Sequence, residues 1–180
     1  MAPRPSPTVD PLHASPALKF HLFAVSAALA VVVAACDQAT KWAVRGSFAL
    51  NESSEVIASF FSLVYVRNTG AVWGSFQDGN EWLALVSVAV AALLIMAFRY
   101  LAAGRLVNAV ALGAILGGIT GNMIDRIRLG WVTDFLDFYI GQRHWPAFNV
   151  ADAAIVTGVG LYLLAALRGA PGREEAADGG

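Results

Sequence analysis

Long uncharged runs alternate with short polar segments along this chain. Four such runs cover residues 20–36, 82–98, 106–124 and 153–167. A bilayer core of roughly 30 Å is crossed by about 20 mostly apolar helical residues. The first three runs are long enough as they stand, and the fourth is long enough if residues 148–152 join its helix. The pattern therefore predicts four membrane-spanning helices, at about 20–41, 82–98, 106–124 and 148–167.

The first run has a second interpretation. Lys19 precedes an apolar stretch ending in Val33-Ala34-Ala35-Cys36, which is similar to the sequence before the lipidated cysteine of a bacterial lipoprotein. A cleaved signal peptide would have such features. Three further spans would still remain in the mature chain. We therefore favour a multi-pass protein in which V-A-A-C occurs by chance.

The segments outside the runs predict a small sheet and two tails. Residues 62–66 (S-L-V-Y-V) are rich in β-branched and aromatic side chains, and Asn68-Thr69-Gly70 supplies turn chemistry after them. We expect a β-rich region over about 43–80, with a loop at 127–147, resting on the membrane surface. The proline-rich residues 1–17 are expected to be a disordered tail and residues 169–180 a solvated one. Residues 18–168 then form one membrane domain.

Charge and tryptophan placement bear on the orientation. Lys and Arg divide six and six between the two predicted sides, but Arg99 and Arg105 bracket a very short loop on the side of the termini. Positive charge in short loops favours the cytoplasm, so we expect both termini to be cytoplasmic. The tryptophans are all predicted to fall on the opposite face, as in an aromatic belt: Trp42, Trp73, Trp82, Trp131 and Trp145.

Composition excludes several classes of protein. The chain is 57% hydrophobic and 14% charged, whereas an average soluble domain is about 25% charged. A net charge of −1 argues against a nucleic-acid partner. The single cysteine excludes a disulfide scaffold, and the three histidines are too far apart in sequence to suggest a zinc site. The chain also has no H-E-x-x-H, G-x-S-x-G or Walker motif.

Several polar residues nevertheless lie at the predicted span ends, where ionisable side chains are costly and suggest function. Asp37 and Lys41 are four positions apart, which predicts an ion pair on one helix face. Asn122, Asp125 and Arg126 share one face at the end of the third span. Structural support between helices explains these residues as well as direct chemistry does.

Two further patterns are explained by packing and capping. Gly113, Gly117 and Gly121 repeat at four, and small residues at this spacing let membrane helices approach closely. Asn149 and Asp152 are three apart at the start of the last span, which predicts an N-cap at Asn149 and its partner at the third helical position.

Asp134 lies between aromatic residues in the connection before the last span. Two carboxylates held together in a partly dry site cannot both ionise, so one keeps a proton. The ionised carboxylate can then activate water while the neutral one donates a hydrogen bond to a scissile carbonyl. Asp134 and Asp152 are the natural pair for such hydrolysis, which needs no metal or cofactor.

These residues resemble the signal peptidase II family, the membrane aspartic proteases of bacteria that process lipoproteins. The similarity lies in five blocks that come in the family's order and reach from the first span to the last. They are D-Q-A-T-K at 37–41, N-T-G-A-V-W-G at 68–74, G-G-I-T-G-N-M-I-D-R at 117–126, V-T-D-F at 132–135 and F-N-V-A-D at 148–152.

The resemblance implies an all-α membrane protein of four transmembrane helices, with a small extracytoplasmic β-rich cradle and both termini cytoplasmic. It implies a bacterial inner-membrane endopeptidase that cuts diacylglyceryl-modified prolipoproteins just before the lipidated cysteine. Asp134 and Asp152 match the family's catalytic aspartates. Membrane lipids are the implied surroundings, and we expect a monomer. The supporting and substrate-binding positions match Asp37, Lys41, Asn68, Gly70, Asn122, Asp125, Arg126 and Asn149.

Two other functions remain as alternatives. Asp125-Arg126, Gly130, Asp134 and Asp137 are faintly similar to the acidic metal-binding pattern of membrane phosphatidyltransferases, although the spacing differs. A small channel or helper protein would use the same polar residues only for packing. For the protease, one further hypothesis follows: a helix N-terminus favours charge on Asp152, so the shared proton resides mainly on Asp134.

Overall fold

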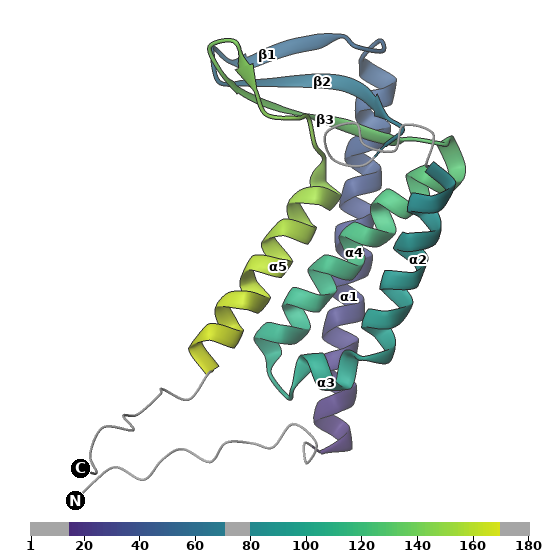
Figure 1. Ribbon diagram of the computed structural model, residues 1–180, viewed down its shortest axis with the longest axis vertical. Coiled ribbons are helices and arrows are strands. Elements are labelled where there is room, and N and C mark those ends of the chain that lie inside the picture. The colour runs from purple at the N-terminus through teal and green to yellow at the C-terminus, as the bar shows by residue number, and fades with distance from the viewer. Residues whose placement is uncertain (1–14, 71–79, 170–180) are drawn as a thin grey trace, which may run out of the picture.

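The computed structural model describes residues 15–70 and 80–169. A bundle of helices carries a small sheet at one end, and the described chain begins and ends at the other (Figure 1). Both predicted tails fall largely outside the described residues, and so does Trp73.

The helices correspond closely to the apolar runs. They are α1 (Pro16–Ser47), α2 (Asn80–Met96), the short α3 (Phe98–Ala102), α4 (Leu106–Leu129) and α5 (Val150–Gly169). α1 begins within the predicted tail 1–17, because Ser15 caps it and Pro16 occupies the first helical position. α1, α4 and α5 are long and apolar enough to cross a membrane, whereas α2 is a shorter apolar helix of 17 residues. Cys36 is an exposed residue within α1.

The glycine ridge on α4 packs against α1, as predicted. A Cβ atom on Gly113 would lie 2.7 Å from the carbonyl oxygen of Ser26, and one on Gly117 would lie 2.7 Å from that of Ala30. Gly118, on another face of α4, meets the backbone of Ala151 in α5. α4 is therefore the central helix, held within backbone contact of both neighbours.

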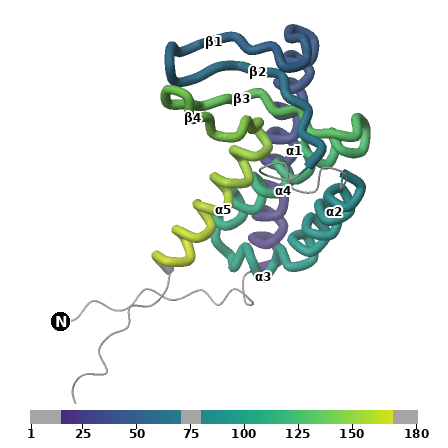
Figure 2. The backbone as a smooth tube through the Cα atoms, turned by 45° about the horizontal axis from the view of Figure 1, so that its top comes forward, coloured from purple at the N-terminus to yellow at the C-terminus, as the bar shows by residue number. Residues whose placement is uncertain are grey.

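A four-stranded antiparallel sheet covers one end of the bundle. Its strands lie in the order β1 (Ser53–Ile57), β2 (Phe61–Asn68), β3 (Val132–Ile140) and β4 (Arg143–His144) (Figure 2). β2 confirms the strand expected at residues 62–66. The all-α class is too narrow, however, and the loop expected at 127–147 contains β3 and β4. Its run of Val, Thr, Phe, Leu and Tyr has high β-propensity, and pairing with β2 satisfies its backbone.

The sheet is fastened to the bundle at two points. Val44 of α1 packs with Tyr65 of β2 and Phe135 of β3 in a buried apolar cluster. Leu136 of β3 also exchanges backbone hydrogen bonds with Phe148, 2.8 Å and 3.1 Å long, just before α5 begins. This bridge fixes the start of α5 against β3, and it places Asn149, at the start of α5, beside Asp134 of β3.

Candidate active site

Asp134 and Asp152 line one cavity between the sheet and the helices. Asp134 lies in β3 with 3% of its surface exposed, and Asp152 is half-buried in the first turn of α5. The cavity has a volume of about 560 Å³. It is also lined by Asn68, Gly70, Asn122, Arg126 and a mainly apolar wall that includes Val132, Trp145, Phe148, Ile155 and Val156.

The predicted cap at the start of α5 is present. The backbone N–H of Asp152 donates to Oδ1 of Asn149 at 3.0 Å, and the backbone N–H of Asn149 donates to Oδ2 of Asp152 at 3.2 Å. This reciprocal pair satisfies two backbone groups at the helix end. It also fixes the orientation of the Asp152 carboxylate, so the capping role and a chemical role are compatible.

Both oxygens of Asp134 accept a hydrogen bond from an asparagine. Nδ2 of Asn149 donates to Oδ1 at 2.6 Å, and Nδ2 of Asn68 donates to Oδ2 at 2.9 Å. The orientation of each side-chain amide is fixed, because its oxygen is held as well. Oδ1 of Asn68 accepts a hydrogen bond from the backbone N–H of Gly70, and Oδ1 of Asn149 accepts one from the backbone N–H of Asp152. The position of the Asp134 carboxyl is therefore determined by asparagines on two segments far apart in the chain.

Asn122 of α4 connects the two carboxylates with a buried cation. Nζ of Lys41 donates to Oδ1 of Asn122 at 2.8 Å, which leaves Nδ2 of Asn122 to donate to Oδ1 of Asp152 at 2.7 Å. Oδ1 of Asn122 also accepts from Nδ2 of Asn149 at 3.2 Å, the same amide group that contacts Asp134. One asparagine pair thus joins Asp134, Asp152 and Lys41.

Beneath this layer lies a fully buried charged triad. Lys41 forms the predicted ion pair with Asp37, with 2.8 Å between Nζ and Oδ2, and its Nζ is 3.5 Å from Oδ2 of Asp125. Oδ1 of Asp37 accepts from the backbone N–H of Ala151, and Oδ2 of Asp125 accepts from that of Thr133, each at 2.9 Å. Each buried acid therefore holds the residue directly before one of the two cavity carboxylates.

Two residues in this network were given no role from the sequence. Gln38 donates to Oδ1 of Asp125 at 3.0 Å, and Nη1 of Arg45 lies 3.7 Å from the same oxygen and donates to Oγ1 of Thr133. Gln38 lies beside Asp37, and Arg45 is one helical turn beyond Lys41, so the helical spacing of polar residues on α1 was the available signal. Arg126 lines the cavity, and its buried Nε has no hydrogen-bond partner among the described residues.

The electrostatics of the two acids differ. Burial, and then the nearby charge of Asp152, raise the pKa of Asp134 to about 7, although the hydrogen bonds from Asn68 and Asn149 oppose the shift. Burial therefore favours the protonated form of the Asp134 carboxyl. The Asp152 carboxyl accepts two hydrogen bonds, from Asn122 and from the backbone N–H of Asn149. Within residues 15–70 and 80–169, no three His, Cys, Asp or Glu side chains are grouped to hold a metal ion.

Comparison with known proteins gives a consistent result. The family model described as "Signal peptidase (SPase) II" matches residues 29–168. The lipoprotein signal peptidase of Moorella thermoacetica is 47% identical over 131 residues, which is 73% of this chain and 85% of that protein. The lipoprotein signal peptidase of Symbiobacterium thermophilum is 43% identical over 140 residues, which is 78% of this chain and 92% of that protein.

A solved structure described as a bacterial membrane enzyme, determined by the in meso method at 2.3 Å resolution, has the same fold. It superposes with a TM-score of 0.76 at 32% sequence identity, and the match covers 86% of this chain and 94% of that one. The match of the family model over most of the chain, together with relatives above 40% identity, establishes that this chain belongs to the signal peptidase II family of aspartic peptidases.

Proposed function

We propose that this chain removes signal peptides from diacylglyceryl-modified prolipoproteins by cutting just before the lipidated cysteine, with Asp134 and Asp152 as its catalytic pair. The family and the printed names of its relatives support a prolipoprotein substrate. The observation that carries the catalytic assignment is that two carboxyl groups of different character line one cavity and are held through Asn122 and Asn149.

The mechanism follows from the protonation difference. Asp152, as the carboxylate, removes a proton from a water molecule, and the oxygen of that water attacks the scissile carbonyl carbon. Asp134, as the acid, donates its proton to the carbonyl oxygen, so the tetrahedral intermediate is neutral. When the C–N bond breaks, the leaving nitrogen takes a proton from Asp152 and Asp134 recovers its own from the intermediate's hydroxyl group. The asparagines keep both carboxyls oriented throughout.

The surroundings of the pair suit a lipidated peptide. The cavity wall that runs along α5 through Ile155 and Val156 is apolar, and Val156 is exposed on the outside of the bundle. Acyl chains attached to the cysteine would lie along this wall while the peptide backbone reaches the carboxyls. An apolar path from the bilayer to a polar site favours a substrate that is itself anchored in the membrane.

We further propose a four-span arrangement in the bacterial inner membrane, with α2 as the fourth span and a monomeric chain. α2 has 17 residues, most of them apolar, which reaches the lower end of the working range for a span. The basic residues Lys19, Arg99, Arg105 and Arg168 all lie at the end opposite the sheet, which supports cytoplasmic termini and an extracytoplasmic site.

The direct test is cleavage of a synthetic lipobox peptide by the purified full-length protein in detergent. We expect scission before the cysteine when the cysteine carries diacylglycerol, as shown by the mass of the products. Equal cleavage of the unlipidated peptide would contradict the proposed substrate. Cleavage should also persist in a metal chelator, since a metal-dependent phosphatidyltransferase would lose its activity there, and a channel or helper protein would cleave neither peptide.

A further inference from the structure

Arg45 of α1 is held against the strand that carries Asp134. Its Nη1 donates a hydrogen bond to Oγ1 of Thr133 at 3.0 Å and lies 3.7 Å from Oδ1 of Asp125. Thr133 and Asp125 are fully buried, whereas the Arg45 side chain keeps 20% of its surface exposed. One nitrogen therefore contacts both the residue before Asp134 and the acid that binds the backbone of that residue.

The charge of Arg45 supports the buried ionic cluster. Asp37 and Asp125 are both fully buried, and Lys41 lies between them as a fully buried cation, with its Nζ 2.8 Å from Oδ2 of Asp37 but 3.5 Å from Oδ2 of Asp125. Arg45 supplies a second cation beside the other oxygen of Asp125. Because a buried acid is costly without a counter-charge, Arg45 stabilises the Asp125 carboxylate at the position where it accepts the backbone N–H of Thr133.

The sheet is irregular beside Asp134, so this residue depends on contacts outside the strand pairing. The register of β2 and β3 shifts between Leu63 and Val66, and Val66 lies opposite Asp134. Such an irregularity disrupts the hydrogen bonds of the ladder and bends the strand. Because side chains alternate along a strand, Thr133 and Asp134 point to opposite faces of β3. A contact that holds the Thr133 side chain therefore limits rotation of the strand about its axis, and with it the direction of the Asp134 carboxyl.

We propose that Arg45 is a positioning residue for peptide cleavage, acting through Thr133 on the Asp134 carboxyl. This inference rests on the proposed catalytic role of Asp134. Arg45 is not among the residues that line the carboxyl cavity, so it acts from behind the strand. A general acid must lie within hydrogen-bond reach of the carbonyl oxygen, and a misplacement of about 1 Å can lower a rate a hundredfold. Loss of the Arg45 contacts therefore slows the chemical step and leaves substrate binding unchanged.

The test measures kcat and KM for a diacylated lipobox peptide with purified full-length variants in detergent. Arg45→Met removes the charge and the donors, and we expect kcat to fall roughly tenfold with KM unchanged. Thermal unfolding shows whether the variant is folded at the assay temperature. Arg45→Lys should recover most of the lost kcat, because a single nitrogen makes both contacts and an ammonium group can take its place.

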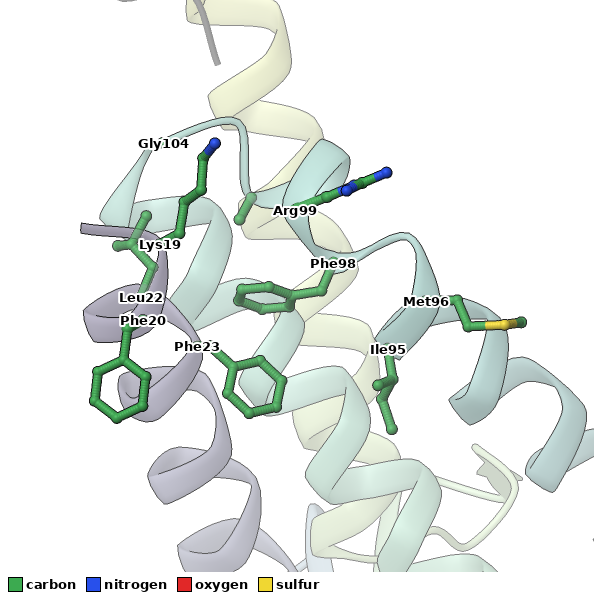
Figure 3. Close-up of a pocket in the computed structure, with 10 residues that line it drawn as sticks. Lys19, Phe20, Leu22, Phe23, Ile95, Met96, Phe98, Arg99 and Gly104 are labelled. Carbon is green, nitrogen blue, oxygen red and sulfur yellow. The ribbon is translucent and has the colours of Figure 1, made fainter. Parts of the chain in front are cut away.

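Thr133→Val removes the hydroxyl group that Arg45 contacts but keeps the shape of the side chain and the backbone N–H. It should lower kcat by a similar factor, and it should add little to the loss in Arg45→Met. Arg99→Met is the matched control, because Arg99 lies at the opposite end of the molecule, where it borders a separate cavity of about 360 Å³ (Figure 3). Its kcat should equal that of the unchanged protein.

Several results would overturn the positioning role of Arg45. They are an unchanged kcat in Arg45→Met, a loss that appears in KM instead, no recovery in Arg45→Lys, full additivity with Thr133→Val, or an equal loss in Arg99→Met. If Arg45→Met does not fold, an unchanged kcat in Thr133→Val overturns the role by itself. A normal Arg45→Met beside an inactive Asp134→Asn would refute this inference alone, whereas full activity of Asp134→Asn would refute the proposed function and this inference together.

Discussion

Asp134 and Asp152 lie close together but in unlike surroundings, and this difference has a consequence for the pH dependence of cleavage. The pKa of Asp134 is raised to about 7 by burial and by the charge of Asp152. Below that pH the Asp134 carboxyl is protonated and can donate to the scissile carbonyl; above it, Asp134 is charged and this donor is lost. We therefore expect kcat to fall as the pH rises through about 7.

The same shift affects stability, with a definite sign. The folded state holds the Asp134 proton more tightly than the unfolded chain, whose carboxyl has the ordinary pKa of 3.8. The resulting stabilisation is full below about pH 4 and is lost as the pH rises toward 7. Between about pH 4 and 7 the unfolding temperature of the unchanged protein should fall as the pH rises, and Asp134→Asn should make this fall smaller. An identical decline in both proteins would show that Asp134 titrates normally.

Lys41 bridges two buried acids, and its removal should be costly. Lys41→Met keeps the approximate length of the side chain but removes the cation between Asp37 and Asp125, so that Asp37 loses its counter-charge and Asp125 retains only Arg45, at 3.7 Å. Loss of one partner from a buried ion pair costs about 3–5 kcal/mol. Thermal unfolding of the purified protein should show this loss. The double variant Asp37→Asn/Lys41→Met should lose less than the sum of its single changes, and full additivity would contradict a direct coupling.

At the scale of elements, the approach of α4 to α1 depends on the absence of side chains along the glycine ridge. A Cβ on Gly117 would lie 2.7 Å from the Ala30 oxygen and 2.7 Å from Cβ of Val33. Gly117→Ala should therefore destabilise the protein by about 1–3 kcal/mol. Gly160→Ala in α5 is the matched control, because nothing lies within 4 Å of the added Cβ there. It should be neutral or slightly stabilising, by up to about 1 kcal/mol. Equal effects of the two substitutions in thermal unfolding would contradict close packing at the ridge.

The elements also show what the sequence could and could not predict. The helices were predictable because their apolar runs have membrane length, and the cap at Asn149 and Asp152 because its partners are three positions apart. β3 was missed because its identity depends on pairing with β2, where Val66 lies opposite Asp134. Local sequence does not reveal such long-range pairing, and the short segment between two predicted spans was therefore interpreted as a loop.

Considered as a whole, the molecule brings together polar residues from segments far apart in the chain. The pairings of Asp37 with Ala151 and of Asp125 with Thr133 attach α1 and α4 to the segments that carry the two cavity acids. Spacing along one helix predicted the contact of Asp37 with Lys41, but no spacing rule connects Asp37 with Ala151, 114 positions away. These long-range contacts within the chain indicate that the buried residues of α1 and α4 position the two cavity acids, a function that the Asp37–Lys41 ion pair alone did not suggest.

The assignment of Asp134 and Asp152 as the catalytic pair is tested most directly by the kcat for a diacylated lipobox peptide. Asp134→Asn and Asp152→Asn should each lower kcat at least about a hundredfold, while thermal unfolding shows that both proteins remain folded. Asp137→Asn is the matched control, since Asp137 lies three residues further along β3 and pairs with the exposed His144 instead. It should retain nearly full activity. Folded Asp134→Asn or Asp152→Asn protein that cleaves the peptide at the rate of the Asp137→Asn control would contradict the assignment.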